Sequence, residues 1–397
     1  MTEIESTPDR MPSRRILFAS HTADFGIFRV GSHHLSRALA SRGHRVAHIS
    51  TPISILHAVK SRRDPEIRRR LQLACGAMVV DSDDRRAHVV PLQVFPCSAN
   101  ERLSATALRL PLRSWRRRIE SFLGGSPDVV LIDQVKMLGL PTLWPSATVV
   151  FRPTDPARST KEAQAFAALT AVSDGVVATS AAILKDLGLP DDMPRMVLEN
   201  GVAYDTLSAG AIVDWEEREG FVYVGALDKR FDWDWLTALA TGVPDQRIDV
   251  WGPVGSAPPM PRNVSLKGPL DYAELPQILA QYRIGLMPFR AGELNAGRSP
   301  MKLYEYLAAG LKVLVAAPAP ASMQGVSGTV AALRGDAAVV ALDMVATPPE
   351  PAGRDAARAM GWAARAEKLE AFIAGLPTNR RAPRTWRSRH QHGRAAL

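Results

Sequence analysis

Short and almost continuous apolar runs recur along the first half of the chain, and each is followed by polar residues. The runs cover residues 16–19, 45–50, 128–133, 147–151 and 175–180. A strand of a parallel sheet is buried on both faces, so it produces a run of this kind rather than an alternating pattern. Residues 33–40 have a helical pattern that Gly43 ends, as a helix C-terminus requires. The pattern predicts a doubly wound α/β domain.

The same alternation starts again near Phe221. Strands are expected at 221–225, 248–252, 264–269, 284–288 and 312–315, with helices at 232–239, 272–281, 299–307 and 354–373. Between the two series, residues 196–202 read as a strand that ends in an Asn-Gly turn, and about 203–220 as a polar, irregular linker. The chain is therefore expected to be α/β, with two Rossmann-like doubly wound parallel-sheet domains.

The domain limits follow from these elements. We expect a disordered N-terminus at 1–13, a first domain at 14–205, a linker at 206–219, a second domain at 220–350 and a disordered basic tail at 378–397. A length of 397 residues agrees with two domains, because one domain takes about 150 residues.

Composition excludes several classes of protein. With 46% hydrophobic and 22% charged residues, the chain is neither largely disordered nor fibrous. It has no apolar stretch of about 18 residues, so no transmembrane helix is expected. Residues 1–15 have no apolar core and do not read as a secretory signal. Two cysteines, Cys75 and Cys97, fit a reducing compartment, and we expect a cytoplasmic protein.

The positive charge is concentrated at one end. The net charge is +9, and six arginines with no acid follow Pro377. The folded body is then only mildly basic, which argues against nucleic acid as a partner. The dinucleotide fingerprint with three glycines is missing at both domain starts, as is the P-loop motif, so nicotinamide and P-loop chemistry are disfavoured. Ligands are still expected at the carboxyl ends of the parallel strands.

The stretch from Arg298 to Gly310 carries the clearest chemistry. A Ser-Pro pair begins its helix, and the free N–H groups at a helix start can receive a diphosphate. Lys302 adds a positive charge in the first turn, and Glu305 lies three residues later on the same face, where a carboxylate can accept bonds from ribose hydroxyls. The alternative is an ordinary amphipathic helix with a Lys–Glu pair.

This stretch resembles the donor-site helix of GT-B glycosyltransferases. The resemblance extends to residues 200–202, 223–228 and 267–270 and to the turn at Gly252. In the first domain, residues 20–25 and 151–155 resemble the xanthan-type glucuronosyltransferases. It implies the GT-B fold, in which the two domains face each other across a cleft, and a C-terminal helix, residues 354–374, that packs back on the first domain.

The resemblance also implies roles for individual residues. Asp155 matches the catalytic base of the family, and Asp24 a residue of the cleft. Lys302 would contact the phosphates or the sugar of the donor, and Glu305 the ribose. The implied donor site comprises Gly225, Leu227, Gly268, Leu270, Arg298, Ser299, Met301, Lys302 and Glu305.

One departure from the family concerns the stereochemistry. The broad retaining family has two glutamates eight positions apart, and counting back from Glu305 gives Gly297, while Glu293 is out of register. This favours an inverting transfer, in which a base takes the proton of the acceptor hydroxyl. Helix N–H groups and Lys302 stabilise the leaving diphosphate, so no metal or other cofactor is expected.

The candidates for the base each have a structural alternative. Asp155 precedes Pro156 and also reads as a turn residue. Asp24 is a second candidate and His21 a third, both in the loop that follows the first strand. A histidine in such a loop more commonly only forms a hydrogen bond within the loop. His33 and His34 are expected at a helix surface and in the core, not as metal ligands, because adjacent helical residues point apart.

Residues 102–123 interleave arginines with Leu, Trp, Ile and Phe. This composition is typical of a segment on an anionic membrane surface, as a lipid-linked acceptor would require. A solvated helix face with some core contacts explains it equally well. A second basic stretch covers residues 60–70.

These observations predict a glycosyltransferase that moves a sugar from a nucleoside-diphosphate donor, with UDP the favoured nucleotide, to a lipid-linked or saccharide acceptor. The product would be an exopolysaccharide or another envelope glycan, made at the cytoplasmic face of the membrane. Two alternatives remain: a nucleotide-sugar epimerase on the same fold, and a non-catalytic subunit that binds nucleotide sugars.

Overall fold

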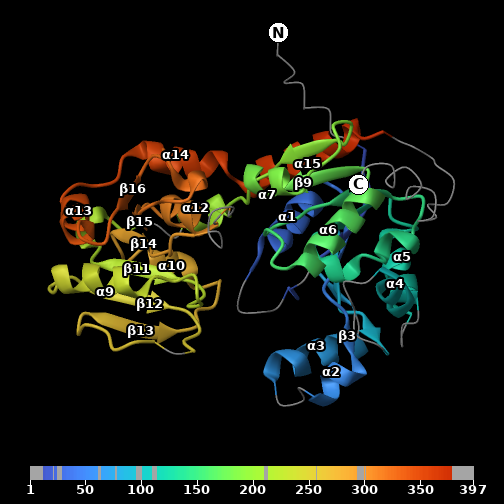
Figure 1. Ribbon diagram of the computed structural model, residues 1–397, viewed down its shortest axis with the longest axis horizontal. Helices are drawn as coiled ribbons and strands as arrows, with labels where there is room; N and C mark the ends of the chain where they lie inside the picture. The colour runs from blue at the N-terminus through green and yellow to red at the C-terminus, as the bar shows by residue number, and fades with distance from the viewer. Residues whose placement is uncertain are drawn as a thin grey trace, which may run out of the picture.

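The computed structural model describes residues 12–20, 22–24, 29–60, 64–76, 78–94, 101–109, 114–209, 213–255, 257–292, 299 and 301–377. Within these residues the chain forms two α/β lobes that lie side by side (Figure 1). The basic tail from residue 378, Cys97, His21 and Arg298 lie outside the described residues.

The first lobe contains an eight-stranded sheet. Its strands are β1 (Arg15–Ala19), β2 (Arg45–Ile49), β4 (Val79–Val80), β5 (Arg86–Val89), β7 (Val129–Ile132), β8 (Thr148–Phe151), β9 (Gly175–Ala178) and β10 (Arg195–Val197). They follow the order β10-β9-β8-β7-β1-β2-β5-β4, in which β4 is antiparallel to β5 and the other pairs are parallel. The order reverses direction between β1 and β7, which is where ligands bind in such sheets.

Helices cover both faces of this sheet. They are α1 (Gly31–Ser41), α4 (Glu101–Arg109), α5 (Trp115–Leu123), α6 (Thr160–Val172) and α7 (Ala181–Asp186), with the short turns η1 (Val135–Met137) and η2 (Leu140–Thr142). Helices α2 (Ile55–Lys60) and α3 (Pro65–Cys75) lie with the two-stranded sheet β3 (Ile53–Ser54) and β6 (Leu92–Gln93) at the lower end of the lobe (Figure 1). The sequence analysis did not predict this extension of the lobe, which includes residues 53–76.

The second lobe contains a six-stranded parallel sheet. Its strands are β11 (Phe221–Val224), β12 (Ile248–Trp251), β13 (Val264–Gly268), β14 (Ile284–Met287), β15 (Lys312–Ala316) and β16 (Thr329–Ala332), in the order β13-β12-β11-β14-β15-β16. The helices are α9 (Trp233–Gly242), α10 (Leu275–Leu279), α12 (Met301–Ala308), α13 (Ala337–Val345) and the turn η4 (Ala321–Met323). This is the Rossmann strand order, and its direction changes between β11 and β14.

The chain crosses between the lobes twice, and both crossings differ in detail from the sequence prediction. The expected irregular linker contains α8 (Tyr204–Ala209) and the turn η3 (Trp215–Glu217). The single helix expected at 354–373 is instead two helices, α14 (Pro351–Ala359) and α15 (Trp362–Gly375), separated at Gly361. The interruption has a physical cause: Val202 bridges to Gly361, its N–H donating to Met360 O (3.0 Å), so the backbone between the helices is used in strand-like pairing.

Helix α15 packs back on the first lobe. It lies against α1 and next to β9 in Figure 1. Trp362, Ala366, Leu369 and Ile373 are buried there. Glu370 of α15 accepts bonds from Arg42 Nε (2.7 Å) and His44 Nε2 (2.9 Å) at the end of α1. The last helix is thus a structural part of the first lobe.

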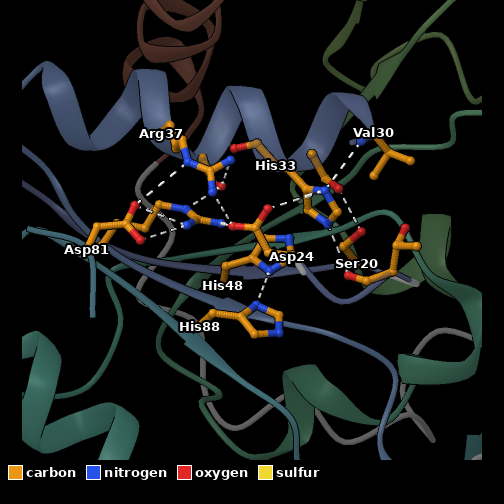
Figure 2. Close-up of polar contacts among 12 residues, drawn as sticks. Ser20, Asp24, Val30, His33, Arg37, His48, Asp81 and His88 are labelled. Carbon is orange, nitrogen blue, oxygen red and sulfur yellow. Dashed lines mark hydrogen bonds and ion pairs between the residues drawn. The ribbon is translucent and has the colours of Figure 1, made fainter. Parts of the chain in front are cut away.

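A buried polar cluster ties α1 to the sheet of the first lobe (Figure 2). Asp24 Oδ2 accepts from Arg37 Nη2 of α1 (2.6 Å) and from Arg86 Nη2 of β5 (2.5 Å). Directly below, His48 of β2 and His88 of β5 are register partners whose Nδ1 atoms lie 2.9 Å apart. The ring of His33 from α1 meets the ring of His48 edge-on at 5.1 Å.

The buried histidines are neutral at neutral pH. Burial lowers the pKa of His33 to about 4, although Asp24 opposes the shift, and lowers that of His88 to about 3. Burial likewise holds the pKa of His48 well below its usual value. For Asp24, burial would raise the pKa, but Arg86, His33 and Arg37 outweigh it, so the pKa is lowered. The cluster is therefore assembled with its arginines and Asp24 charged and its histidines uncharged.

These shifts make stability depend on pH. In the unfolded chain the histidines take up protons near pH 6.5, whereas the folded protein keeps them neutral, so the unfolded state binds more protons and the free energy of unfolding falls as the pH falls from 7 toward 4. Replacing His48 with Asn removes one of the groups that take up a proton in the unfolded chain. We expect the free energy of unfolding to fall less steeply with falling pH in His48→Asn than in the parent protein, by about 1 kcal/mol per pH unit between pH 6 and pH 5. Urea unfolding at several pH values measures this free energy. Equal slopes of the free energy against pH for both proteins would contradict a neutral His48 in the folded state.

Candidate active site

The carboxyl ends of both sheets open onto one cavity between the lobes, with a volume of about 460 Å³. The first lobe lines it with residues that follow β1, β7 and β8, and the second with residues that follow β11 and β12 and with the start of α12. The site residues in the lining are Asp133, Asp155, Arg158, Asn200, Gly225, Leu270, Tyr272, Ser299, Met301, Lys302 and Glu305. The point at which the strand order changes direction in each sheet therefore borders the same cavity, as expected for a ligand site.

Helix α12 begins at this cavity and carries the charge toward it. Lys302 lies in its first turn, where the N–H groups of a helix lack partners within the helix. The ammonium is 5.9 Å from the ring centroid of Tyr223. Gly225, directly after β11, lies against this lysine: a Cβ at Gly225 would be 2.1 Å from Lys302 Cε and 2.6 Å from Nζ. The absence of a side chain at Gly225 is thus what lets Lys302 lie over the end of β11.

Glu305 lies one turn after Met301 and is nearly inaccessible, with 8% exposure. Burial raises the pKa of its carboxyl to about 7, and Lys302 opposes the shift. The carboxyl still lines the cavity. A buried acceptor beside a lysine at a helix start is suited to hydroxyl groups that lie next to an anion.

Asp155 lines the cavity from the opposite lobe. It follows β8, and its Oδ2 accepts from Arg158 Nη2 (3.2 Å). Its side chain is 36% exposed, so one carboxylate can meet a ligand while remaining paired. Arg230 of the second lobe pairs with Asp228, and both residues line the same cavity. Asp155 also contributes to the raised pKa of Arg230, after the larger effect of the hydrogen bond that Arg230 donates to Asp228, so Asp155 and Arg230 lie within electrostatic reach of each other across the cleft.

A second carboxyl group of the first lobe was missed by the sequence analysis. Asp133 directly follows β7, at the switch point, and its side chain is 2% exposed. Burial raises its pKa to about 7, opposed by Arg152, whose Nη1 lies 3.8 Å from Asp133 Oδ2. Its Oδ1 has no hydrogen-bond partner among the described residues. Its position at the end of the strand predicted at 128–133 was the available signal.

An aromatic contact closes one side of the cleft and was also missed. His34 stacks on Trp362 of α15 with ring centroids 5.3 Å apart, and meets Tyr272 of the second lobe at the same distance. Arg29 lies over the Tyr272 ring at 5.2 Å. His33 and His34 are both buried, whereas the sequence analysis expected one of them at the surface. The reason is that α1 is covered by the sheet on one side and by α15 and Tyr272 on the other.

Three expected site residues are placed elsewhere. Asp24 is not in the cavity lining but in the buried cluster of Figure 2, where its charge balances Arg37 and Arg86. Leu227 packs against the core of the second lobe. Gly268 is also absent from the lining, and its carbonyl accepts the Gly252 N–H (2.7 Å), while its neighbour Leu270 reaches the cavity.

The described residues contain no group of three or more His, Cys, Asp or Glu that could hold a metal ion. No helix in the described part of the chain has the length and apolar character needed to cross a bilayer.

Comparison with known proteins decides between the families that share such a two-lobed fold. Residues 17–173 match the model for "Glucuronosyltransferase GumK, N-terminal domain", and residues 229–370 match the model for "Glycosyl transferase-like" domains. Both halves of the chain are thus similar to glycosyltransferase domains, and the fold is that of the GT-B glycosyltransferases. The two GT-B lobes are thus matched separately, one by each model.

One relative and several solved structures are similar to the chain. The chain is 30% identical over 130 residues to the glycosyltransferase TuaH of Bacillus subtilis strain 168, assigned to teichuronic acid biosynthesis; the match covers 30% of this chain and spans a third of the relative (33%). AviGT4, a glycosyltransferase of avilamycin A biosynthesis, is 16% identical, with a TM-score of 0.57 over 91% of this chain and 98% of that one. A glycosyltransferase from Rickettsia africae ESF-5 is 12% identical, with a TM-score of 0.63 over 92% and 100%. These structures establish the GT-B fold.

The contact of Gly225 with Lys302 leads to a prediction for the GT-B cleft. In Gly225→Ala the new methyl group would displace the flexible lysine side chain from the end of β11. We expect affinity for UDP to fall about tenfold, the loss of one charge-assisted contact, and the melting temperature to fall as well, because the φ of +156° at Gly225 is one that residues with a side chain rarely adopt. Isothermal titration measures it. Gly255→Ala in the same lobe is the control, because a Cβ there meets nothing within 4 Å; equal losses in both variants would refute the assignment.

Proposed function

We propose that this GT-B protein transfers a sugar from a nucleoside-diphosphate donor, UDP being the favoured nucleotide, to a hydroxyl group of a saccharide or lipid-linked acceptor. One observation carries the proposal: the start of α12, with Lys302 and Glu305, and the carboxylate of Asp155 line the same cavity from opposite lobes. A cation for a leaving diphosphate and a base for an incoming alcohol are the two groups that an inverting transfer requires.

The reaction proceeds as a single displacement. The acceptor oxygen attacks the anomeric carbon while the bond from that carbon to the diphosphate oxygen breaks, and Asp155 takes the hydroxyl proton. The electron pair leaves with the nucleoside diphosphate, whose negative charge is stabilised by Lys302 and by the N–H groups at the start of α12. Glu305 accepts hydrogen bonds from the ribose. These groups supply acid–base and electrostatic stabilisation without a metal ion or another cofactor, and inversion follows from one displacement.

The comparisons support the class of product. The first lobe is similar to a glucuronosyltransferase domain, and the partial relative is assigned to teichuronic acid biosynthesis. Both are glycosyltransferases named for acidic sugars or for polymers that contain them. We therefore propose an exopolysaccharide or another cell-envelope glycan as the product, with synthesis on the cytoplasmic side.

Two substitutions test the assignment of the base and of the phosphate-binding residue. We expect Asp155→Asn to lower kcat about 10²- to 10⁴-fold, the usual contribution of a general base, while UDP still binds. Lys302→Ala should instead raise the Kd for UDP by about tenfold or more, because a direct charge–phosphate contact is lost. UDP release from UDP-sugars in the presence of a lipid-linked saccharide measures the rates, and titration calorimetry the binding.

Matched controls are available outside the cleft. Asp234→Asn removes a carboxylate with 71% side-chain exposure on α9, and Lys161→Ala an exposed lysine on α6; both should behave as the parent protein. Full activity of Asp155→Asn and Lys302→Ala would refute the site. Conversion of a UDP-sugar without any acceptor would favour an epimerase, and UDP binding with no turnover a non-catalytic subunit.

A second segment, besides residues 102–123, has the composition for peripheral membrane contact. In residues 102–123, the apolar side chains of Trp115, Ile119 and Leu123 are buried in the core, while Leu103 is 61% exposed. Helix α2 has the character sought: Ile55, Leu56 and Val59 are 48%, 49% and 65% exposed. Exposed arginines of α3, which packs against α2, lie nearby at positions 68 and 69. We propose that α2 and α3 contact an anionic membrane surface.

The exposed residues of α2 give a direct test. Leu56→Ser combined with Val59→Ser should lower the fraction bound to phosphatidylglycerol vesicles severalfold, since less apolar area is buried at the interface. Sedimentation with vesicles at low and high salt measures it, with Val339→Ser as the control, an exposed valine of α13 on the other lobe. Binding that is unchanged by the double substitution would contradict this surface.

A further inference from the structure

Asn200 connects the two lobes at the edge of the cleft. Its backbone N–H donates to Ser299 Oγ (2.8 Å), and its side-chain Nδ2 donates to the backbone oxygen of Ser299 (2.9 Å). Ser299 is 9% exposed and lies two residues before α12. The residue that leads into the proposed phosphate-binding helix is therefore held by both the main chain and the side chain of Asn200.

The other end of the amide is held by the first lobe. Arg152, directly after β8, is completely buried, and its Nη2 donates to Asn200 Oδ1 (3.2 Å). A guanidinium only donates and a carbonyl oxygen only accepts, so the amide has a single orientation, with its oxygen toward Arg152 and its nitrogen toward Ser299. On its far side Arg152 faces Asp133, at 3.8 Å. A series of polar contacts thus runs from Asp133 of the first lobe, through Arg152 and Asn200, to Ser299 before α12.

The space around this contact is closed. A Cβ at Gly31, the first residue of α1, would lie 2.4 Å from Asn200 Oδ1. Met301, the first residue of α12, packs against the cluster of the first lobe that contains Trp362. The two crossings of the chain also pair nearby, where Val202 bridges to Gly361. The start of α1, the end of β8 and the start of α12 therefore meet at Asn200.

We propose that Asn200 is a positioning residue for the transfer: it holds the donor-binding helix at a set distance and angle from the first-lobe residues of the cleft. It acts through Ser299 and α12, and it does not itself bind the nucleotide. The proposal rests on the transfer reaction proposed above. A displacement of about 1 Å between reacting groups can lower a rate about 10²-fold, so a contact of this kind affects the rate while each half of the site stays intact.

The nearly isosteric variant Asn200→Asp tests the proposal. It keeps the contact with Arg152 but replaces the N–H donor facing Ser299 O with an oxygen, so that two acceptors oppose each other. We expect kcat at saturating donor and acceptor to fall at least tenfold, while the Kd for UDP changes by less than threefold. Asn200→Ala should likewise lower kcat and leave the Kd for UDP nearly unchanged.

The control is Asn263→Asp. Nδ2 of Asn263 donates to the carbonyls of Ala240, Val243 and Gln246, all within the second lobe. This variant should lower the melting temperature and leave kcat per folded molecule unchanged. A kcat for Asn200→Asp equal to that of the parent would overturn the proposal, and so would a rise in the Kd for UDP as large as the loss in kcat, which would assign Asn200 to donor binding.

A spectroscopic measurement separates this proposal from the proposed function. Cys75, exposed on the first lobe, and Val339→Cys on the second can carry spin labels once Cys97 is replaced by serine. The distance distribution with UDP bound should be narrow in this background and broad after Asn200→Asp. Broadening in a protein that transfers no sugar would refute the function and keep the positioning role. An unchanged distribution with unchanged kcat would refute the positioning role alone.

Discussion

The structure depends on a chain that crosses twice between its lobes, with the two crossings paired to each other. Val202 and Gly361 bridge where the chain leaves the first lobe and returns to it. The returning helix α15 then buries one face against α1 and the first sheet. Two paired crossings restrict the relative movement of the lobes far more than one linker would. The carboxyl ends of the parallel strands of both sheets open onto one cavity.

The cavity has a buried acid with a neighbouring cation on each side. Asp133 of the first lobe lies near Arg152, and Glu305 of the second lies near Lys302. Burial raises both pKa values to about 7, and in each case the cation opposes the shift. Deeply buried carboxyl groups next to a cleft are costly for folding and are typical of functional sites. The partly exposed Asp155 differs from both, since its carboxylate is available to an incoming ligand.

The elements that the sequence predicted well are those that local patterns control. The strands at 16–19, 221–225 and 284–288 were found because buried parallel strands are apolar throughout. The helix at Lys302 and Glu305 was found because a Ser-Pro pair marks a helix start. Asp24, in contrast, follows a strand just as Asp155 does, yet it pairs with Arg86, which lies 62 residues away. Nothing in the local sequence distinguishes these two aspartates, because the difference comes from their long-range partners.

By itself, the sequence determined the two α/β halves, the helix that presents Lys302 to a ligand, and the carboxylate of Asp155 as a candidate base. The first two follow from periodicity and capping, which are local properties, and the third also from the resemblance to a known family. Only the tertiary structure decided that Asp133 and Glu305 are buried beside cations, that Trp115 belongs to the core, and that Asn200 binds Ser299. Burial and pairing between residues about 100 positions apart depend on how the lobes pack, and this cannot be read from neighbouring residues.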